Sequence, residues 1–446
     1  MPKPRYLALA DKLAAAIETN KLVPGTRLPT HRAFAKQFGI ALATATRTYG
    51  ELERRGFVIG EAGRGTFVRD INLPLTLGAH QTAGDDLIDL VFNMPGSAAD
   101  ANMLRTGLRR LASAGDMDAM LRYQPHGGRT HERRIMAKWV GKTLGTFDPE
   151  RLLVTSGSQH GLAIIALGLL RRGDIVAADT LTYPGFKSVA ALRGLDLLPV
   201  EGKNGVMDPD KLDDACHAHA IRAVYLMPSV HNPLGSVMDA ATRLRIIEVV
   251  RKHDLLIIED AAYAFLEADP PPSLFALAPE RTLHVGGFSK SLATGLRLGY
   301  VVTPEIHLQQ LLEAIRATTW NAPALISALV SGWIEDGTLA ALEEVRRRDG
   351  AARQHLLRAA FAGTPVISHR NAGFAWIPLE KGVRSEPIVT YLKTQGISVS
   401  GAEAFATTKA VPQALRLAFG GIPIDASSAV FRTVHQSVIK SGASKS

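Results

Sequence analysis

The segment GGFSKSLATGLRLGY, residues 286–300, decides how this 446-residue chain is interpreted. It follows the apolar run Thr282 to Val285, which predicts a buried strand. Two basic residues, Lys290 and Arg297, stand seven positions apart among glycines and other small residues. A lysine can condense with an aldehyde, and the planar guanidinium fork of an arginine can hold a phosphate. On a surface turn both side chains would simply be solvated, so the neighbouring elements decide between the two interpretations.

Apolar runs of strand length recur along the chain, at residues 152–155, 175–178, 195–200, 223–227, 255–258 and 283–285. Most are separated by helical patterns, at residues 161–172, 209–218 and 240–253. Buried strands that alternate with helices predict an α/β fold, with a mostly parallel, doubly wound sheet covered on both faces. Beyond residue 303, long helices and strands at 374–377, 397–400 and 414–419 predict a smaller α+β lobe.

Polar side chains follow five of the predicted strands, at the sheet edge where ligands of α/β proteins bind. They are Ser156, Gly157 and Ser158 after the first strand, Tyr183 after the second, Asn232 after the fourth, Asp260 and Tyr263 after the fifth, and Lys290 after the sixth. Singly, these residues also suit a helix cap, a turn, an ion pair or a packing ring. Together they supply what pyridoxal phosphate (PLP) requires, namely an amine for its aldehyde, donors for its phosphate and a ring for its aromatic face.

The order of these motifs resembles that of the fold-type I PLP enzymes, in the aminotransferase class that contains aspartate and aminoadipate transaminases. The resemblance spans roughly residues 88–435. It implies that Lys290 forms the internal aldimine and moves the substrate's α-proton, that Asp260 keeps the pyridine nitrogen protonated, and that Arg416 in ALRLAFGG binds the α-carboxylate. The other implied contacts are Asn232 at the phenolic oxygen and the substrate, Tyr263 at the phenolic oxygen, Tyr183 on the ring face, Ser156, Gly157, Ser158, Ser289 and Arg297 at the phosphate, and Tyr123 in LRYQPHGG at the phosphate of a neighbouring subunit.

Two positions depart from this family pattern. Gly287 stands three residues before Lys290, where the family usually has a phosphate-binding serine, and Thr294 replaces a common proline. Every group needed for the first half of transamination is nevertheless present. Arg416 is the most informative of these groups, because a protein that only stored the cofactor would not need a carboxylate-binding arginine.

The first seventy residues are strongly basic. They contain twelve Lys or Arg and six Asp or Glu, a net charge of +6, whereas the whole chain carries +9. A basic module beside a nearly neutral remainder is the charge distribution expected of a nucleic-acid-binding protein. The pattern predicts helices at residues 6–19, 31–38 and 41–55, and then a hairpin at 57–59 and 63–68.

The run PGTRLPTHRAFAKQFGIALATATRTYGELERRGFVIGEAGRGTFV resembles the winged helix-turn-helix of GntR-type regulators, over nearly all of residues 6–69. Hydroxyl and guanidinium side chains on its third helix suit phosphates and base edges in a major groove. The resemblance implies DNA contacts by Arg32, Thr44, Thr46 and Arg47, and by Arg64 of the wing in the minor groove. His31 departs from the acidic residue that is usual there. The alternative for this module is a small basic helical domain that binds protein.

Together, the two modules resemble the MocR group of bacterial regulators over nearly the whole chain. We expect a winged helix-turn-helix at residues 1–69, a linker at 70–86, a large PLP-binding domain at 87–302 and a small lobe at 303–446. The resemblance implies a homodimeric transcriptional regulator that binds double-stranded operator DNA and senses an amino acid, an amine or PLP itself through an aldimine at Lys290. Two alternatives stay open, a working aminotransferase with an appended DNA-binding module and a scaffold whose large domain only dimerises.

The composition is ordinary for a globular protein, with 46% hydrophobic and 21% charged residues. The longest clean apolar run, residues 162–170, is shorter than the roughly 20 residues that span a bilayer. The charged N-terminal stretch does not resemble a signal peptide. A single cysteine, Cys216, excludes an internal disulfide and fits a reducing cytoplasm. We therefore expect a cytoplasmic protein, and the motifs predict no metal site.

Overall fold

The N-terminal region folds as a winged helix-turn-helix in the computed structural model, as the sequence predicts. The structure describes residues 4–19, 21–23, 25–61, 65–68, 87–95, 98–114, 117–203 and 205–443. The elements of this region are α1 (Arg5–Glu18), α2 (His31–Phe38), α3 (Leu42–Arg54), β1 (Val58–Glu61) and β2 (Gly65–Val68). The two strands pair antiparallel, from Val58 opposite Val68 to Glu61 opposite Gly65. Arg64 and the predicted linker at 70–86 lie outside the described residues.

Local signals fix the ends of α2 and its packing on α3. The Thr30 side chain accepts a hydrogen bond from the backbone N–H of Ala33 at 3.2 Å, which caps the helix. Gly39 ends the helix in the left-handed region at φ 56°, which glycine adopts without a steric cost. The rings of Phe34 and Tyr49 lie 5.0 Å apart between centroids. The turn at Gly39 and this aromatic contact together hold α3 in its orientation relative to α2.

The large sheet has seven strands in the order β4-β12-β11-β10-β9-β5-β6. They are β4 (Leu152–Thr155), β5 (Ile175–Asp179), β6 (Asp196–Val200), β9 (Ile221–Leu226), β10 (Leu256–Asp260), β11 (Thr282–Gly287) and β12 (Gly299–Val302). The neighbours from β6 to β11 are parallel, whereas β12 is antiparallel to both β11 and β4. The predicted fold class is confirmed. β12 is not among the predicted strands, because its four residues, GYVV, form a short apolar run that follows directly on the Lys290–Arg297 segment.

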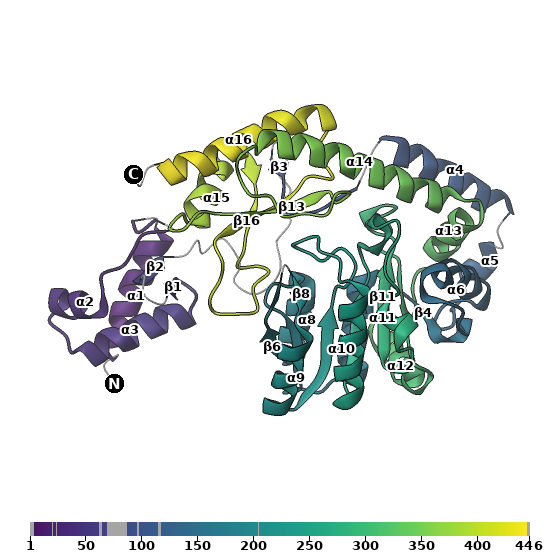
Figure 1. Cartoon of the computed structure of the whole chain (residues 1–446), viewed down its shortest axis with the longest axis horizontal. Coiled ribbons are helices and arrows are strands. Elements are labelled where there is room, and N and C mark those ends of the chain that lie inside the picture. Colours follow the sequence, from purple (N-terminus) through teal and green to yellow (C-terminus); the bar gives the residue numbers. More distant parts are fainter. Residues whose placement is uncertain are drawn as a thin grey trace.

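Helices cover both faces of this sheet (Figure 1). One face carries α7 (Ser158–Leu169), α8 (Pro184–Arg193) and α12 (Leu308–Thr318), and the other carries α9 (Pro209–Ala218), α10 (Ala240–Lys252) and α11 (Leu274–Leu277). Helices α6 (Thr130–Leu144) and α13 (Ala324–Glu335) pack beside β4 and β12. The layers of the large sheet thus include α12 and α13, which lie beyond the expected boundary at residue 303. No described helix is by itself long and apolar enough to cross a membrane, although α13 and the helix after it, bent by 80°, meet those criteria as a pair.

The C-terminal lobe is built on a three-stranded antiparallel sheet, β13-β16-β15. Its elements are β13 (Phe374–Pro378), β15 (Ser400–Gly401), β16 (Ala414–Ala418), α14 (Thr338–Ala360), α15 (Ser385–Thr394) and α16 (Ile424–Ala443). Strand β3 (Ile88–Asp89) pairs in parallel with β14 (Ile397–Ser398), and Leu90 is fully buried in the lobe's core. The chain therefore contributes β3 to this lobe first. Further along the sequence it forms α4 (Ala98–Ala114), α5 (Met117–Met120) and the large sheet.

The winged helix-turn-helix lies against the C-terminal lobe at the start of α15 (Figure 1). The guanidinium carbon of Arg384 lies 3.8 Å from the centroid of the Phe67 ring in β2. Glu386 holds that guanidinium through an ion pair of 2.9 Å. On the same side, a Cβ placed on Gly25 would lie 3.3 Å from the ring of Pro387. A cation–π contact and close packing thus join the base of the wing to the lobe.

Candidate functional site

A cavity of about 330 Å³ lies at the carboxyl ends of the parallel strands, between the large sheet and the C-terminal lobe. The sequence-predicted residues that line it are Ser158, Tyr183, Asn232, Asp260, Tyr263, Ser289, Lys290, Arg297 and Arg416. The first eight come from the strand ends of the large sheet and Arg416 comes from β16 of the lobe. The fold therefore brings together in one cavity side chains that are up to 258 positions apart in the sequence.

Lys290 stands three residues beyond β11, on the turn that leads towards β12. Its Nζ donates a hydrogen bond to the carbonyl oxygen of Asn93 at 2.8 Å and lies 6.0 Å from the centroid of the Tyr263 ring. Within the described residues, this carbonyl is the acceptor that holds the amine at one wall of the cavity. A ligand carbonyl can compete for that position.

Asp260 ends β10 and is almost completely buried. Its Oδ2 accepts a hydrogen bond from the Tyr225 hydroxyl at 2.7 Å, and its Oδ1 accepts one from the backbone N–H of Ala262 at 3.0 Å. Burial raises the pKa of Asp260, while these two donors and the charge of His284 act in the opposite direction. The result is a fixed acceptor deep in the cavity.

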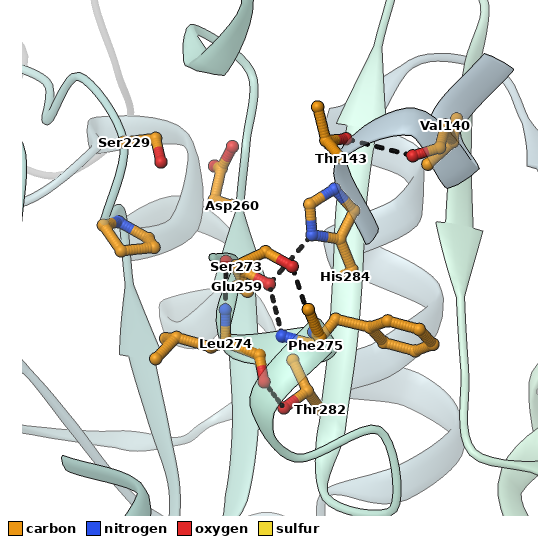
Figure 2. Close-up of polar contacts among 12 residues, drawn as sticks. Val140, Thr143, Ser229, Glu259, Asp260, Ser273, Leu274, Phe275, Thr282 and His284 are labelled. Atoms are coloured by element: carbon orange, nitrogen blue, oxygen red, sulfur yellow. Dashed lines mark hydrogen bonds and ion pairs between the residues drawn. The ribbon is translucent and has the colours of Figure 1, made fainter. Parts of the chain in front are cut away.

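A second buried carboxylate, that of Glu259, lies next to Asp260 on β10 and stabilises this strand through its hydrogen bonds (Figure 2). Its two oxygens accept hydrogen bonds from the backbone N–H groups of Leu274 at 2.9 Å and Phe275 at 3.0 Å. His284 Nδ1 lies 2.9 Å from Oε2. Burial opposes ionisation of Glu259, but His284 and the two N–H groups hold its pKa below the ordinary value. This network holds β10 and β11 next to each other. Asp260 ends β10, and the turn that carries Lys290 follows β11.

The hydroxyl of Tyr263 lies among positive groups. Burial alone would raise the pKa of Tyr263, but the charges of Lys290 and Arg416 and a 3.5 Å hydrogen bond from the Asn93 amide lower it. Tyr183 differs, because burial raises the pKa of its phenol and the nearby Asp260 adds to the effect. Of these two phenols, Tyr263 is the one whose pKa lies below its ordinary value.

One corner of the cavity is suited to a dianion. Gly157 precedes α7 at φ 88°, and a Cβ there would lie 2.9 Å from Nη2 of Arg297. Arg297 Nη1 lies 3.5 Å from Ser289 Oγ. At Gly287 a Cβ would lie 2.4 Å from Ser158 Oγ, so the glycine leaves the space that this hydroxyl occupies. Backbone N–H groups at a helix N-terminus, two hydroxyls and a guanidinium converge on this corner.

Arg416 connects the two walls of the cavity. Its Nη1 donates to the carbonyl oxygen of Val91 at 2.8 Å, and its Nη2 lies 3.4 Å from Oδ1 of Asn232. The rings of Phe374 and Phe405 lie 5.0 and 5.8 Å from its guanidinium carbon. Burial lowers the pKa of Arg416, with Tyr263 and Asp89 opposing that effect. The guanidinium of Arg416 lines the cavity and has the planar geometry that suits a carboxylate.

Three predicted residues, Tyr123, Ser156 and Gly157, are not among the residues that line the cavity. Tyr123 is 88% exposed, and its ring lies 5.6 Å from that of Trp320. Ser156 lies beside the cavity, where its backbone N–H donates to Nδ1 of His160 at 3.1 Å. The prediction for Tyr123 concerns a neighbouring subunit, so a single chain does not test it.

Several residues at the site have no motif that would predict them. Val91 and Asn93 supply acceptors for Arg416 and Lys290 from the irregular segment after β3. Tyr225 contacts Asp260 from inside β9, where the sequence pattern shows only one more apolar strand residue. Phe405 lines the cavity from a loop of the lobe. All residues of β9 except Arg222 are buried, so the burial pattern of this strand gives no signal that singles out Tyr225.

The surface of the helix-turn-helix carries most of the residues predicted to contact DNA. Arg32, Thr46 and Arg47 are exposed, and Thr44 is half-buried. Thr46 Oγ1 lies 3.3 Å from His31 Nδ1, so the residue that departs from the family pattern touches the reading helix α3. The exposed set forms a polar and basic face on α2 and α3.

The fold and the cavity define a class of protein with two modules, a winged helix-turn-helix and an α/β domain with a ligand site at its strand ends. The chain belongs to the aminotransferase class I and II family, whose model matches residues 85–426. Residues 5–68 match the model of the bacterial regulatory proteins of the gntR family.

Relatives share either both modules or the larger one. The uncharacterized HTH-type transcriptional regulator YdeF of Bacillus subtilis is 28% identical over 92% of this chain and 89% of its own length. The probable rhizopine catabolism regulatory protein MocR of Rhizobium meliloti is 25% identical over 89% of this chain and 86% of its own. The 2-aminoadipate transaminase of Thermus thermophilus is 32% identical over 60% of this chain and 69% of its own.

Solved structures show the same fold in the larger module. LysN, an α-aminoadipate aminotransferase from Thermus thermophilus, has a TM-score of 0.72 at 25% identity, over 80% of this chain and 93% of its own. An archaeal alanine:glyoxylate aminotransferase has a TM-score of 0.73 at 19% identity, over 89% of this chain and 95% of its own. Both similarities extend across the large sheet and the C-terminal lobe.

Proposed function

We propose that this protein is a cytoplasmic, homodimeric transcriptional regulator that binds operator DNA with residues 5–68 and holds PLP in the cavity, where it senses an amino compound. The observation that carries the proposal is the presence in one chain of a basic DNA-reading face and a cavity lined by Lys290, Asp260 and Arg416. Relatives named as transcriptional regulators match this chain over 92% and 89% of its length, which supports the proposal.

The residues that line the cavity fit PLP in kind and in position. Bound PLP would supply a reactive carbonyl carbon and an electron-withdrawing aromatic ring. Lys290 would offer its amine to the carbonyl carbon, Asp260 would pair with the ring nitrogen, and Tyr183 would cover the ring. Ser158, Ser289 and Arg297, with the N–H groups at the start of α7, would hold the phosphate. Asn232 and Tyr263 would donate to the phenolic oxygen. The cradle at Gly157 and Gly287, which a Cβ would fill, supports this assignment.

The effector is an amine that also carries a carboxylate. Arg416 supplies a guanidinium fork on the C-terminal lobe, opposite the amine of Lys290 on the large sheet. Its present partners are the carbonyl oxygen of Val91 at 2.8 Å, the amide oxygen of Asn232 at 3.4 Å and the Tyr263 hydroxyl, and a carboxylate can compete with them by forming a bidentate pair. Binding of the carboxylate would draw β16 towards Asn232. The C-terminal lobe then closes on the large sheet.

The lobe that carries Arg416 also touches the DNA-binding module, through Arg384 and Phe67. A ligand shifts an equilibrium between two conformations only by its difference in affinity for them. An effector that binds both Arg416 and the large sheet favours the closed lobe. The contact at α15 transmits that preference to the winged helix-turn-helix.

A second candidate function is catalysis of transamination, with the DNA-binding module as an addition. The observation that favours it is the complete set of acid, base and carboxylate-binding residues in the cavity. Sustained turnover of an amino acid with a keto acid, at the 1–1,000 s⁻¹ typical of enzymes, would support this candidate. A single incomplete turnover with a change in DNA affinity supports the regulator.

The decisive experiment measures DNA affinity and cofactor absorbance together. Purified protein with PLP is titrated with a panel of amines and amino acids, and fluorescence anisotropy reports its binding to DNA from upstream of its own gene. We expect Lys290→Ala to lose the absorbance of a lysine-bound carbonyl cofactor and the effector response. The matched control is Lys381→Ala, which removes an exposed lysine of the C-terminal lobe. Lack of specific DNA binding by the wild type would overturn the proposal.

The variant Arg416→Gln tests recognition of the effector's carboxylate separately from recognition of its amine. This variant should keep the cofactor absorbance, because Arg416 touches neither Lys290 nor Asp260 through any hydrogen bond found in the structure. It should lose at least tenfold in sensitivity to amino acids, since a charged hydrogen-bonded pair contributes about 1.5–3 kcal/mol. Its response to amines that lack a carboxylate should be unchanged. An equal loss for both ligand types would show that Arg416 does not read the carboxylate.

A further inference from the structure

Tyr225 is a buried tyrosine whose hydroxyl touches a functional residue. Its ring stacks on Phe186 with the centroids 3.9 Å apart and the planes 6° from parallel. The side chain has no solvent exposure, and its hydroxyl donates to Oδ2 of Asp260 at 2.7 Å. Burial raises the pKa of Tyr225 well above its ordinary value, and the Asp260 carboxylate adds to this. The hydroxyl therefore keeps its proton and remains a donor throughout the physiological pH range.

The hydrogen bond from Tyr225 matters for the ionisation of Asp260, because Asp260 is buried and accepts few other hydrogen bonds. A carboxylate taken out of water tends to bind a proton, unless donors replace the lost hydration. The donors to Asp260 within the described residues are the Tyr225 hydroxyl and the Ala262 N–H. The carboxylate of the neighbouring Glu259 is turned towards the N–H groups of α11 (Figure 2). The other titratable groups that act on Asp260 are Tyr183, Tyr263 and His284.

We propose that Tyr225 is a positioning residue, which holds the Asp260 carboxylate in place and favours its ionised form opposite the ring nitrogen of PLP. This inference rests on the proposed function for the identity of the ring. A proton shared between a carboxylate and a pyridine nitrogen can reside on either atom. Donation by the Tyr225 hydroxyl to Oδ2 stabilises the charged carboxylate, so it favours the proton on the ring nitrogen. Tyr225 thereby acts on the ring through Asp260, without touching it.

A purely structural role for Tyr225 is the competing explanation, and Tyr225→Phe separates the two. Phenylalanine keeps the ring that stacks on Phe186 and removes only the hydroxyl. The matched control is Tyr300→Phe on β12, which removes a half-buried phenol of the same sheet. The ring of Tyr300 packs against His284 and Phe288, away from the cavity lining. Tyr300→Phe should leave the state of Asp260 unchanged.

The first measurement uses holoprotein prepared with PLP labelled with ¹⁵N at the ring nitrogen. In the wild type and in Tyr300→Phe the NMR shift should be that of a protonated ring nitrogen. In Tyr225→Phe it should move towards that of a neutral pyridine, because the proton passes to Asp260. An unchanged ¹⁵N shift in Tyr225→Phe would overturn the inference even when the cofactor is bound.

The second measurement uses the apoprotein, so that it does not depend on the proposed cofactor. Aspartate is labelled with ¹³C at Cγ, and the Asp260 signal is assigned from its loss in Asp260→Asn. In Tyr225→Phe the carboxyl group should ionise at a pH higher by about one or more, since one hydrogen bond to a charge is lost. Identical titration curves would refute the role of Tyr225. Failure of the wild type to bind PLP would instead refute the proposed function, and this apoprotein result would still stand.

Discussion

At the residue scale, Gly287 and Ser158 share one small volume at the phosphate corner. A Cβ at position 287 would lie 2.4 Å from Ser158 Oγ and 3.4 Å from the Ser158 backbone nitrogen. The glycine that departs from the family pattern thus makes room for a hydroxyl that arrives from α7. We expect the Ser158 hydroxyl to take the place of the phosphate-binding serine that is usual at position 287.

We expect Gly287→Ala to weaken PLP binding about tenfold, because the methyl group displaces a hydroxyl that would donate to a charged phosphate. The measurement is a fluorescence titration of apoprotein with PLP. In a Ser158→Ala background the same glycine substitution should cost little, since no Oγ is left to displace. Full additivity of the two effects would show that the two residues do not compete for this space.

Residue types and strand order were enough to predict the polar residues at the strand ends that line the cavity, because the carboxyl ends of parallel strands must meet at one edge. Tyr183, Asn232, Asp260 and Lys290 could be assigned in this way. The contacts of Asn93 and Tyr225 could not. Asn93 lies in an irregular segment whose path depends on the C-terminal lobe, and Tyr225 stands in a strand that is buried almost throughout, so no pattern distinguishes it from its neighbours.

At the scale of elements, α8 holds a loop of the C-terminal lobe over the cavity. Lys187 donates from Nζ to the carbonyl oxygens of Glu403 at 3.1 Å, Ala404 at 2.8 Å and Ala406 at 2.6 Å. The backbone N–H of Thr182 donates to the carbonyl oxygen of Phe405 at 2.8 Å. Burial lowers the pKa of Lys187 to about 8. The loop that covers the cavity is thus fastened by a side chain that titrates above neutral pH.

This pKa has a defined consequence for stability. An unfolded lysine titrates near 10.4, so between pH 8 and 10 the unfolded chain binds more protons than the folded one at this site. The free energy of unfolding should therefore rise with pH across this window, by at most about 1.4 kcal/mol per pH unit. Lys187→Met should remove this slope and Lys381→Met should keep it, as measured by denaturant unfolding at each pH. Parallel curves for the wild type and Lys187→Met would contradict the assignment.

The elements themselves were largely predictable, and the exceptions have physical reasons. Helices 31–38 and 209–218 and strand 152–155 agree with α2, α9 and β4 at both ends. Each has a capping residue or a fully buried run that marks it. Strand β12 was missed because four residues after a basic turn give too little pattern, and its antiparallel pairing follows only from the neighbours it finds. Packing of α12 and α13 on the large sheet likewise depends on tertiary contacts.

At the scale of the whole molecule, the contact of Arg384 with Phe67 joins two modules that are more than 300 residues apart in the chain. We expect Arg384→Ala to leave both modules folded and to reduce the effect of an effector on DNA affinity. A cation–π contact contributes about 0.5–2 kcal/mol, so the loss should be roughly twofold to thirtyfold. The measurement is DNA affinity with and without the effector.

The matched control for this contact is Lys393→Ala, which removes an exposed basic residue from the same helix, α15. It should leave the effector response intact. A double-mutant cycle with Phe67→Leu tests whether the two side chains act as a pair. An effector response that is unchanged in Arg384→Ala would show that the modules communicate by another route.

The exposed Tyr123 tests whether two chains share their sites. Tyr123→Ala and Lys290→Ala should each impair PLP binding in a pure dimer. In a mixed dimer of the two variants, one cavity should receive both native residues, and the other should receive neither. We expect half-occupancy to return on mixing, as measured by cofactor absorbance of the purified mixed dimer. No recovery on mixing would mean that Tyr123 serves its own chain or has no part in the site.

The pairing of β3 with β14 has a consequence for how the protein would meet its operator. Residues 88–90 are fixed to the C-terminal lobe, so the DNA-binding module is attached to that lobe by its chain connection as well as by its surface contact. A helix-turn-helix dimer reads two half-sites about one helical turn, roughly 34 Å, apart. Rotation of the two lobes would change the span between the two reading helices. The effector would then select operators by the number of base pairs between their half-sites, with the base contacts themselves unaltered.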